Sequence, residues 1–228
     1  MRVTGVDACR RGWVAVGLAG PGRAQSGGVQ VHAVRVHASL AGVLEGDGAS
    51  VVGIDMPLGL LESGWREADR AARGLLGPRR SSVFAIPPRA VWAQASYQAA
   101  NQRCRELTGQ GLAIQTWGLR AKLLEADLYR ATCGHPLYEV HPELAFGAMA
   151  GAPLRNSKHT AAGRDQRREL LVRAGIVIPG VPRGAPVTDT LDAAAVAWSA
   201  WRIAIGQAVV VPGLPEQDSQ GREIAIRY

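Results

Sequence analysis

Two aspartates follow short apolar runs, and their positions suggest one shared chemical site. Asp7 ends the stretch RVTGVD, and Asp55 ends the stretch VVGID. Apolar runs of this kind are typical of central strands that are covered on both faces. The carboxyl ends of such strands meet at one edge of an open α/β sheet, where ligands bind. The pattern therefore predicts that the two carboxylates lie close together.

Four further acids occupy comparable positions later in the chain. Glu139 and Glu143 flank the end of another short apolar run, PLYEV. Asp189 and Asp192 lie three residues apart in the first turn of the clearest expected helix and therefore share one of its faces. Each acid also has a structural alternative, such as capping a turn or interacting favourably with a helix dipole. A structural role, however, does not require all six at one edge.

A cluster of these carboxylates would need a cation. Like charges about 4 Å apart repel by roughly 4 kcal/mol at an effective dielectric near 20. Mg²⁺ and Mn²⁺ prefer oxygen ligands, and two such ions can activate a water molecule and stabilise the leaving oxygen of a phosphodiester. We therefore expect either ion at this edge. The candidate metal ligands are Asp7, Asp55, Glu139, Glu143, Asp189 and Asp192.

The elements that would position these acids follow from the hydrophobic pattern. Tight turns join the first three expected strands, which are therefore antiparallel, whereas the last two are reached through helices and should run parallel to the first. This predicts one α/β domain over 1–228, with a mixed five-stranded sheet, flanking helices and a helical insert at about 65–132. The expected strands are 2–7, 12–18, 29–36, 51–55 and 136–140, and the expected helices are 40–45, 65–77, 97–107, 112–132, 143–150, 164–174 and 188–206.

The basic residues are concentrated in two stretches. The net charge is +7, and the range 66–105 holds eight arginines against two acids. A second stretch, 155–173, holds six basic residues against two acids. Such patches suit a phosphate backbone, and a solvated face is the alternative.

Composition excludes several other classes. Three cysteines (Cys9, Cys104 and Cys133) form no CxxC pair, which argues against a zinc cluster and for a reducing compartment. The chain enters a strand pattern at once, without a secretory signal, and its most apolar helical stretch, 193–201, is too short to span a bilayer. We therefore expect a cytoplasmic protein.

Six blocks of the chain together resemble a known family. The blocks are GVDACRRGW, IDMPLGL, RRSSVFAIPPR, YEVHPELAF, SKHTAAGRDQRREL and TDTLDAAAVAWSA, which run in the family's order between about residues 2 and 206. They are similar to an uncharacterised family of predicted RNase H-like nucleases. The resemblance implies an RNase H-like fold, in agreement with the strand order. Thr188 departs from the pattern, because the family often has an aspartate there.

The resemblance also implies roles for individual residues. It places the family's acids on Asp7, Asp55, Glu143 and Asp192, with Glu139 and Asp189 beside them, and it implies a basic position at Lys158. The leading hypothesis is a metal-dependent nuclease in which Asp7 bridges two ions, Asp55 and Asp192 each hold one, and Glu143 ligates or orients water. The residues expected to hold substrate phosphates, besides Lys158, are Arg79, Arg80, Ser81, Ser82, Arg89 and Arg167.

Two alternatives stay open at this point. An actin-like phosphotransferase would also carry an aspartate at its first strand end, but it needs two such domains, and no Walker A loop is present. A non-catalytic module that binds nucleic acid or a partner is the other alternative, and Thr188 motivates it. The sequence does not distinguish DNA from RNA.

Overall fold

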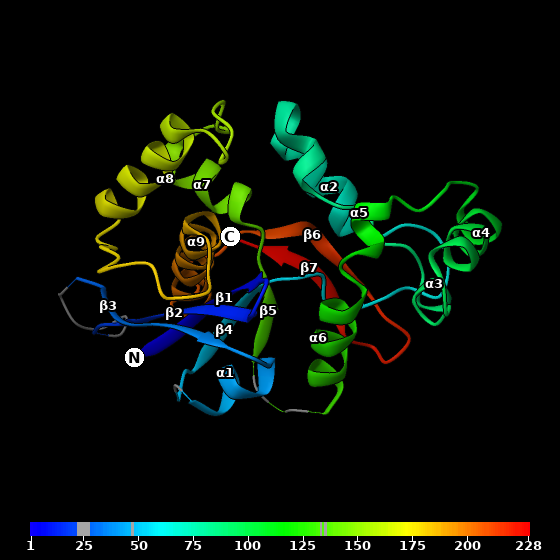
Figure 1. Ribbon diagram of the computed structural model, residues 1–228, viewed down its shortest axis with the longest axis horizontal. Helices are drawn as coiled ribbons and strands as arrows, with labels where there is room; N and C mark the ends of the chain where they lie inside the picture. Colours follow the sequence, from blue (N-terminus) through cyan, green and yellow to red (C-terminus); the bar gives the residue numbers. More distant parts are fainter. Residues whose placement is uncertain (22–27, 47, 133, 135) are drawn as a thin grey trace.

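A mixed five-stranded sheet forms the centre of the molecule. The computed structural model describes residues 1–21, 28–46, 48–132, 134 and 136–228. The strand order is β3-β2-β1-β4-β5 (Figure 1). β1 pairs antiparallel with β2, β2 pairs antiparallel with β3, and β1, β4 and β5 are parallel. The strands are β1 Arg2–Cys9, β2 Gly12–Ala19, β3 Gln30–His37, β4 Val51–Asp55 and β5 Leu137–Glu139. The predicted RNase H-like α/β fold is thereby confirmed.

Helices cover both faces of this sheet. One core packs α7 (Pro142–Ala150), α8 (Ala161–Arg173) and α9 (Val187–Ala204) against one face. A second core packs α1 (Leu40–Gly46) and α6 (Arg120–Thr132) against the other. β1 and β4 are almost wholly buried between these layers, as their apolar sequences require.

A close approach of α9 to the sheet fixes where its first turn lies. A Cβ atom added to Gly5 in β1 would lie 2.0 Å from the backbone nitrogen of Ala197 in α9, so only glycine fits there. The alanine-rich face of α9 therefore lies directly on β1, with Ala193, Ala194 and Ala197 completely buried. This contact brings the N-terminal end of α9 to the carboxyl ends of β1 and β4.

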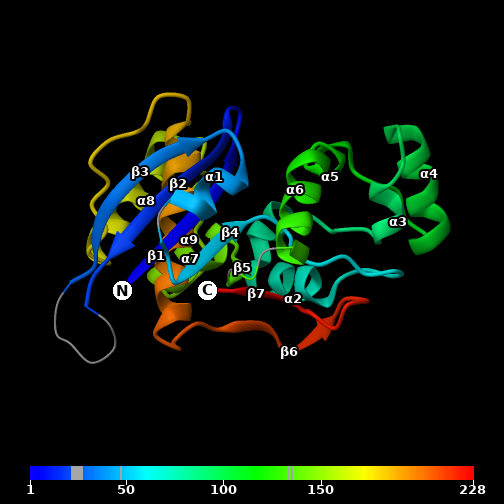
Figure 2. The ribbon, with the colours of Figure 1, turned by 90° about the horizontal axis from the view of Figure 1, so that it is seen from below.

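The chain between β4 and β5 is helical, as predicted. In two views, α3 and α4 lie far from β3, at the opposite end of the molecule (Figures 1 and 2). Some details differ from expectation. Residues 78–82 and 89–92 lie outside the expected helices but belong to a short 3-10 helix and a short α-helix, and the helix expected over 112–132 is divided at Gly118. The elements are α2 Glu67–Leu76, η1 Gly77–Ser82, α3 Arg89–Trp92, α4 Tyr97–Thr108, α5 Ile114–Trp117 and α6.

A C-terminal hairpin was not predicted. β6 (Val210–Gln217) pairs antiparallel with β7 (Glu223–Arg227), and their register shifts between Val211 and Glu216. Pro212, Gly213 and Pro215 interrupt β6, and prolines of this kind argue against a strand when only the sequence is read. β7 lies beside β5 and buries Ile224 and Ile226.

Two earlier expectations concern features outside the fold itself. None of the helices in the described ranges has both the length and the apolar character that crossing a membrane requires. Cys9 and Cys104 are buried free cysteines, whereas Cys133 lies outside the described residues. That the whole chain is a single domain stays a prediction.

Candidate active site

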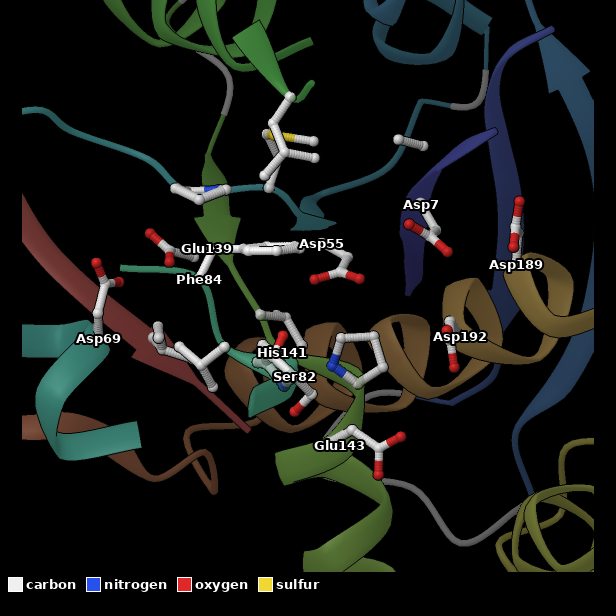
Figure 3. Close-up of a pocket in the computed structure, with 18 of the residues that line it drawn as sticks. Asp7, Asp55, Asp69, Ser82, Phe84, Glu139, His141, Glu143, Asp189 and Asp192 are labelled. Atoms are coloured by element: carbon white, nitrogen blue, oxygen red, sulfur yellow. The ribbon is translucent and has the colours of Figure 1, made fainter. Parts of the chain in front are cut away.

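One cavity at the carboxyl ends of the parallel strands collects the predicted acids. Its volume is about 270 Å³. Figure 3 shows acidic side chains from different strands and helices directed into the same space. Lys158 and Ser82 also line it. The six predicted acids at the cavity are Asp7, Asp55, Glu139, Glu143, Asp189 and Asp192.

Strand register and helix position explain this convergence. Asp7 and Asp55 are direct partners in the parallel pairing of β1 with β4, so both leave the sheet at the same level. Asp189 and Asp192 lie near the start of α9, whose N-terminal end sits over the same edge. Glu143 lies in the first turn of α7.

Three aspartates here have unusual protonation equilibria. Burial, together with the charges of Asp55 and Asp192, raises the pKa of Asp7 well above its ordinary value. Burial and the charge of Asp192 raise the pKa of Asp55 to about 8. The pKa of Asp192 is also raised by burial, although the Lys158 ammonium, 2.5 Å from its Oδ2, acts in the opposite direction. Neither Asp7 nor Asp55 has an ion-pair partner in the part of the chain that the structure describes.

Glu139, in contrast, is fully engaged by the protein. Nη2 of Arg66 lies 2.7 and 2.6 Å from its two oxygens, and the Leu58 backbone NH donates to Oε2 at 2.7 Å. Arg66 is completely buried and also lies 3.5 Å from Asp69. These contacts favour a positioning role for Glu139, since its oxygens already accept hydrogen bonds. Its predicted role as a metal ligand stays untested.

Glu143 is half engaged, through Arg167. Nη2 of Arg167 lies 2.5 Å from Oε1 of Glu143, while Oε2 is buried without a partner. Arg167 is completely buried and also donates to the carbonyls of Gly163 and Asn156. The prediction that Arg167 holds substrate phosphate stays untested, but burial favours a role in orienting Glu143.

Comparison with known proteins places the chain in a family. Residues 5–217 match the model described as "Protein of unknown function (DUF429)". The chain belongs to this family. No curated protein matches it. Among solved structures it is similar to "Thermus thermophilus RuvC structure", with 16% identity, a TM-score of 0.41, and coverage of 91% of this chain and 98% of that one. It is also similar to "T. thermophilus RuvC in complex with Holliday junction substrate", with 14% identity, a TM-score of 0.40, and coverage of 91% and 97%.

Of the residues expected to bind substrate phosphates in this DUF429 member, only some reach the cavity. Ser82 lines the cavity, and Arg79 donates to the Asn156 carbonyl at 2.7 Å, two residues before Lys158. Arg80 and Ser81 are exposed and do not line the cavity. Arg89 lies apart from the cavity and pairs with Asp127 at 2.6 Å. Contact of these side chains with substrate stays a prediction, and for Arg89 the existing ion pair favours a structural role.

Several residues at the site were not assigned there from the sequence. Arg66 and Asp69 lie three apart, at the N-cap and in the first turn of α2, and this spacing was their only local signal. Phe84 lines the cavity, and its only signal was its place in the arginine- and serine-rich block. His141, whose contact with the site was left open, lines the cavity with a pKa lowered by burial, and its Nε2 lies 3.2 Å from the Ser82 carbonyl.

The donor set fits a hard divalent cation in chemistry but not yet in arrangement. All candidate ligands are carboxylate oxygens, and Oδ1 of Asp192 and Oε2 of Glu143 are buried without a partner. Within the described ranges, however, no three His, Cys, Asp or Glu side chains stand together as a group able to hold a metal ion. The ammonium of Lys158, rather than a metal ion, neutralises Asp192. A cation here would therefore compete with the lysine for Asp192.

Proposed function

We propose that this DUF429 member is a metal-dependent nuclease, a hydrolase that cleaves phosphodiester bonds in nucleic acid. The observation that carries the proposal is the convergence of Asp7, Asp55 and Asp192 on one cavity, where burial and the charges of neighbouring carboxylates raise their pKa values. Buried like charges are costly and mark functional sites more often than structural ones. A divalent cation relieves that repulsion, and Mg²⁺ and Mn²⁺ are the ions we propose.

Each side chain has a proposed task. Asp7, whose pKa is raised by the charges of both Asp55 and Asp192, is the ligand that two ions would share, while Asp55 and Asp192 would each hold one. Bound Mg²⁺ or Mn²⁺ would supply Lewis acidity and lower the pKa of water. Oε2 of Glu143 would accept a hydrogen bond from the attacking water, because Arg167 already holds the other oxygen. The Lys158 ammonium would leave its ion pair with Asp192 and bind a phosphate oxygen of the substrate.

Positive charge beside the cavity supports a polyanionic substrate. Arg80 and Arg155 are exposed, and each lies within three residues of a side chain that lines the cavity, Ser82 and Lys158 respectively. Arginines in such positions hold phosphates in extended nucleic acid, and their contribution weakens as salt concentration rises. The proposal covers both DNA and RNA as substrates, and a cytoplasmic location stays a prediction.

The test is cleavage of labelled single-stranded, duplex and DNA–RNA hybrid substrates with Mn²⁺. We expect Asp7→Asn to reduce cleavage by at least about 100-fold, since oriented electrostatic groups in active sites commonly contribute that much. Asp165→Asn is the matched control, because Asp165 is an exposed acid in α8 that pairs only with Arg168 among the described residues. Cleavage that is absent, or equal in the two variants, would contradict the proposal.

A second candidate function rests on one observation. Because Lys158 already neutralises Asp192 and the described residues contain no ready group of three metal ligands, the fold could bind nucleic acid without catalysis. In that case binding would be strong at low salt, independent of divalent ions, and unaffected by Asp7→Asn. Anisotropy titrations of labelled strands with and without EDTA separate this candidate from the nuclease.

A further inference from the structure

The cavity is lined by two chemically different groups of side chains, and the proposed function so far uses only the acids. Beside the carboxylates, its wall is built from apolar side chains: Met56, Pro57, Val83, Phe84, Leu119 and Ile226. A cation site alone needs no such wall. These apolar side chains are therefore a candidate subsite for the part of a ligand that is attached to the phosphate.

Among these apolar side chains, Phe84 differs from the others in its exposure. Met56, Val83 and Ile226 are at most 4% exposed, whereas Phe84 is 36% exposed, which makes it the only aromatic residue classed as exposed in the described ranges. In Figure 3 it projects into the cavity on the side of Glu139 and Asp55. An aromatic ring left open beside a charged site loses the benefit of burial unless a ligand covers it.

The size and borders of the cavity restrict what can cover that ring. A volume of about 270 Å³ lies just below the range of roughly 300–1,000 Å³ for pockets that enclose drug-sized ligands. Ser82 and Lys158 line the same cavity, and the hydrogen bond from Arg79 to Asn156 joins the two segments that carry them. This bond holds the two lining segments together, so we expect it to favour a narrow ligand on that side. One nucleotide fits these limits better than a base-paired duplex.

We infer that the cavity receives a single unpaired nucleotide of a nucleic-acid strand, with its base stacked on Phe84 and its phosphate near Asp7 and Asp55. The inference deepens the proposed function, on which the placement of the phosphate rests, by naming the substrate as an unpaired strand. Every base has a flat face, so stacking on one aromatic ring gives affinity without a strong sequence preference. Arg80, two residues before Ser82, is exposed and would be available to the phosphates of adjacent nucleotides.

The decisive experiment isolates the base by using two probes that differ only in having one. Binding of thymidine 5′-monophosphate and of deoxyribose 5-phosphate is measured by calorimetry in Mn²⁺, with uridine 5′-monophosphate and ribose 5-phosphate as the ribose pair. We expect the nucleotide to bind about 5- to 100-fold more tightly than the sugar phosphate, the range that one stacked base provides. Phe84→Ala should bring this ratio close to one, and Phe84→Trp should preserve it.

Controls make the result interpretable whatever the catalytic outcome. Leu214→Ala removes a side chain that is 91% exposed in β6 and should leave the ratio unchanged. Phe84→Leu serves as a second variant if Phe84→Ala does not fold, and it should lower the ratio in the same direction. A ratio near one in the native protein, or one unchanged without the ring, would overturn the inference, as would no measurable binding of either probe.

This design separates the inference from the proposed function. A ratio that depends on Phe84, in a protein that cleaves nothing, would support the nucleotide subsite and contradict the nuclease. Cleavage with a ratio near one would do the reverse. A nuclease that uses the subsite should also cleave a single strand at least about ten times faster than the same strand in a blunt duplex, and Phe84→Ala should reduce that preference.

Discussion

The carboxylates at the sheet edge fall into two groups that differ in how their charge is balanced. Glu139 and Asp69 face a completely buried arginine, Arg66, and both accept backbone hydrogen bonds, from Leu58 and Ile86. Asp7 and Asp55 lie at the ends of adjacent strands, as Glu139 does, but no described cationic side chain pairs with them. The protein has therefore neutralised one group internally and left the other to an external partner.

This difference separates a structural use of buried acids from a chemical one. Even with Arg66 and the Ile86 NH acting against it, burial raises the pKa of Asp69 to about 7. Burial and the charge of Asp192 raise the pKa of Asp55 to about 8, although the charge of Lys158 acts against them. A buried acid is costly in both places. At Asp7 and Asp55 the acid borders the cavity without an ion-pair partner among the described residues, which is where a ligand can gain from it.

Arg66 gives the largest effect that would test the comparison. We expect Arg66→Met to lower the free energy of unfolding by about 3–5 kcal/mol, because it leaves Glu139 and Asp69 buried without their cation. Urea denaturation followed by circular dichroism measures this change. Arg70→Met is the matched control: Arg70 lies in the same helix and pairs with Glu67, but it is 70% exposed, so its loss should cost less than about 1 kcal/mol. Equal losses in the two variants would remove the distinction between the groups.

The two groups also differ in how far the sequence reveals them. Asp7 and Asp55 were predicted, since an acid after an apolar strand is a local pattern and parallel pairing then brings the strand ends together. The contact of Arg66 with Glu139 joins residues 73 positions apart, and nothing in either local sequence indicates the partner. Arg167 was predicted to bind substrate because its basic character is visible in the sequence. Its burial against Glu143 is another long-range contact that the local sequence does not reveal.

The same reasoning applies to the fold. The strand order followed from hydrophobic periods and short turns, which are local signals that the tertiary structure reinforces. The β6–β7 hairpin was missed because Pro212 and Pro215 oppose a strand, and its pairing depends on packing against α2 and on contact with β5 that a local pattern does not contain. Ile226, which this hairpin contributes to the cavity wall, was missed with it.

The unneutralised group should make the metal-free protein less stable as pH rises. Folded Asp55 has a pKa of about 8, and in the unfolded chain an aspartate has a pKa of about 3.9. Between these values the folded state holds a proton that the unfolded state has released, so stability is complete below about pH 4 and is lost as pH approaches 8. With each pKa unit equivalent to about 1.4 kcal/mol, we expect Asp55→Asn to remove about 2–4 kcal/mol of this decline.

The measurement is urea denaturation in EDTA at several pH values between 5 and 8.5. Asp69 titrates in the same window and in the same direction, so the difference between the native protein and Asp55→Asn removes its contribution. That difference reports Asp55 together with Asp7, because the charge of Asp55 raises the pKa of Asp7. Asp165→Asn, at an exposed position, should reproduce the native curve. If Asp55→Asn also reproduces it, the carboxylate at the end of β4 is not the costly group that the comparison requires.

The smallest expected effect concerns Lys158, a cation that lines the cavity and pairs with Asp192. Because its ammonium lies 2.5 Å from Oδ2 of Asp192, Lys158→Met should free that carboxylate and strengthen Mn²⁺ binding by about 3- to 10-fold, as the loss of a partly exposed competing charge suggests. The same change should weaken binding of nucleotide phosphate, since the lysine is then missing from the occupied site. Calorimetry with Mn²⁺ and with thymidine 5′-monophosphate measures both constants. Opposite shifts would mean that Lys158 moves between aspartate and phosphate, whereas weaker Mn²⁺ binding would mean that it orients Asp192 as a ligand and that metal and lysine occupy the site together.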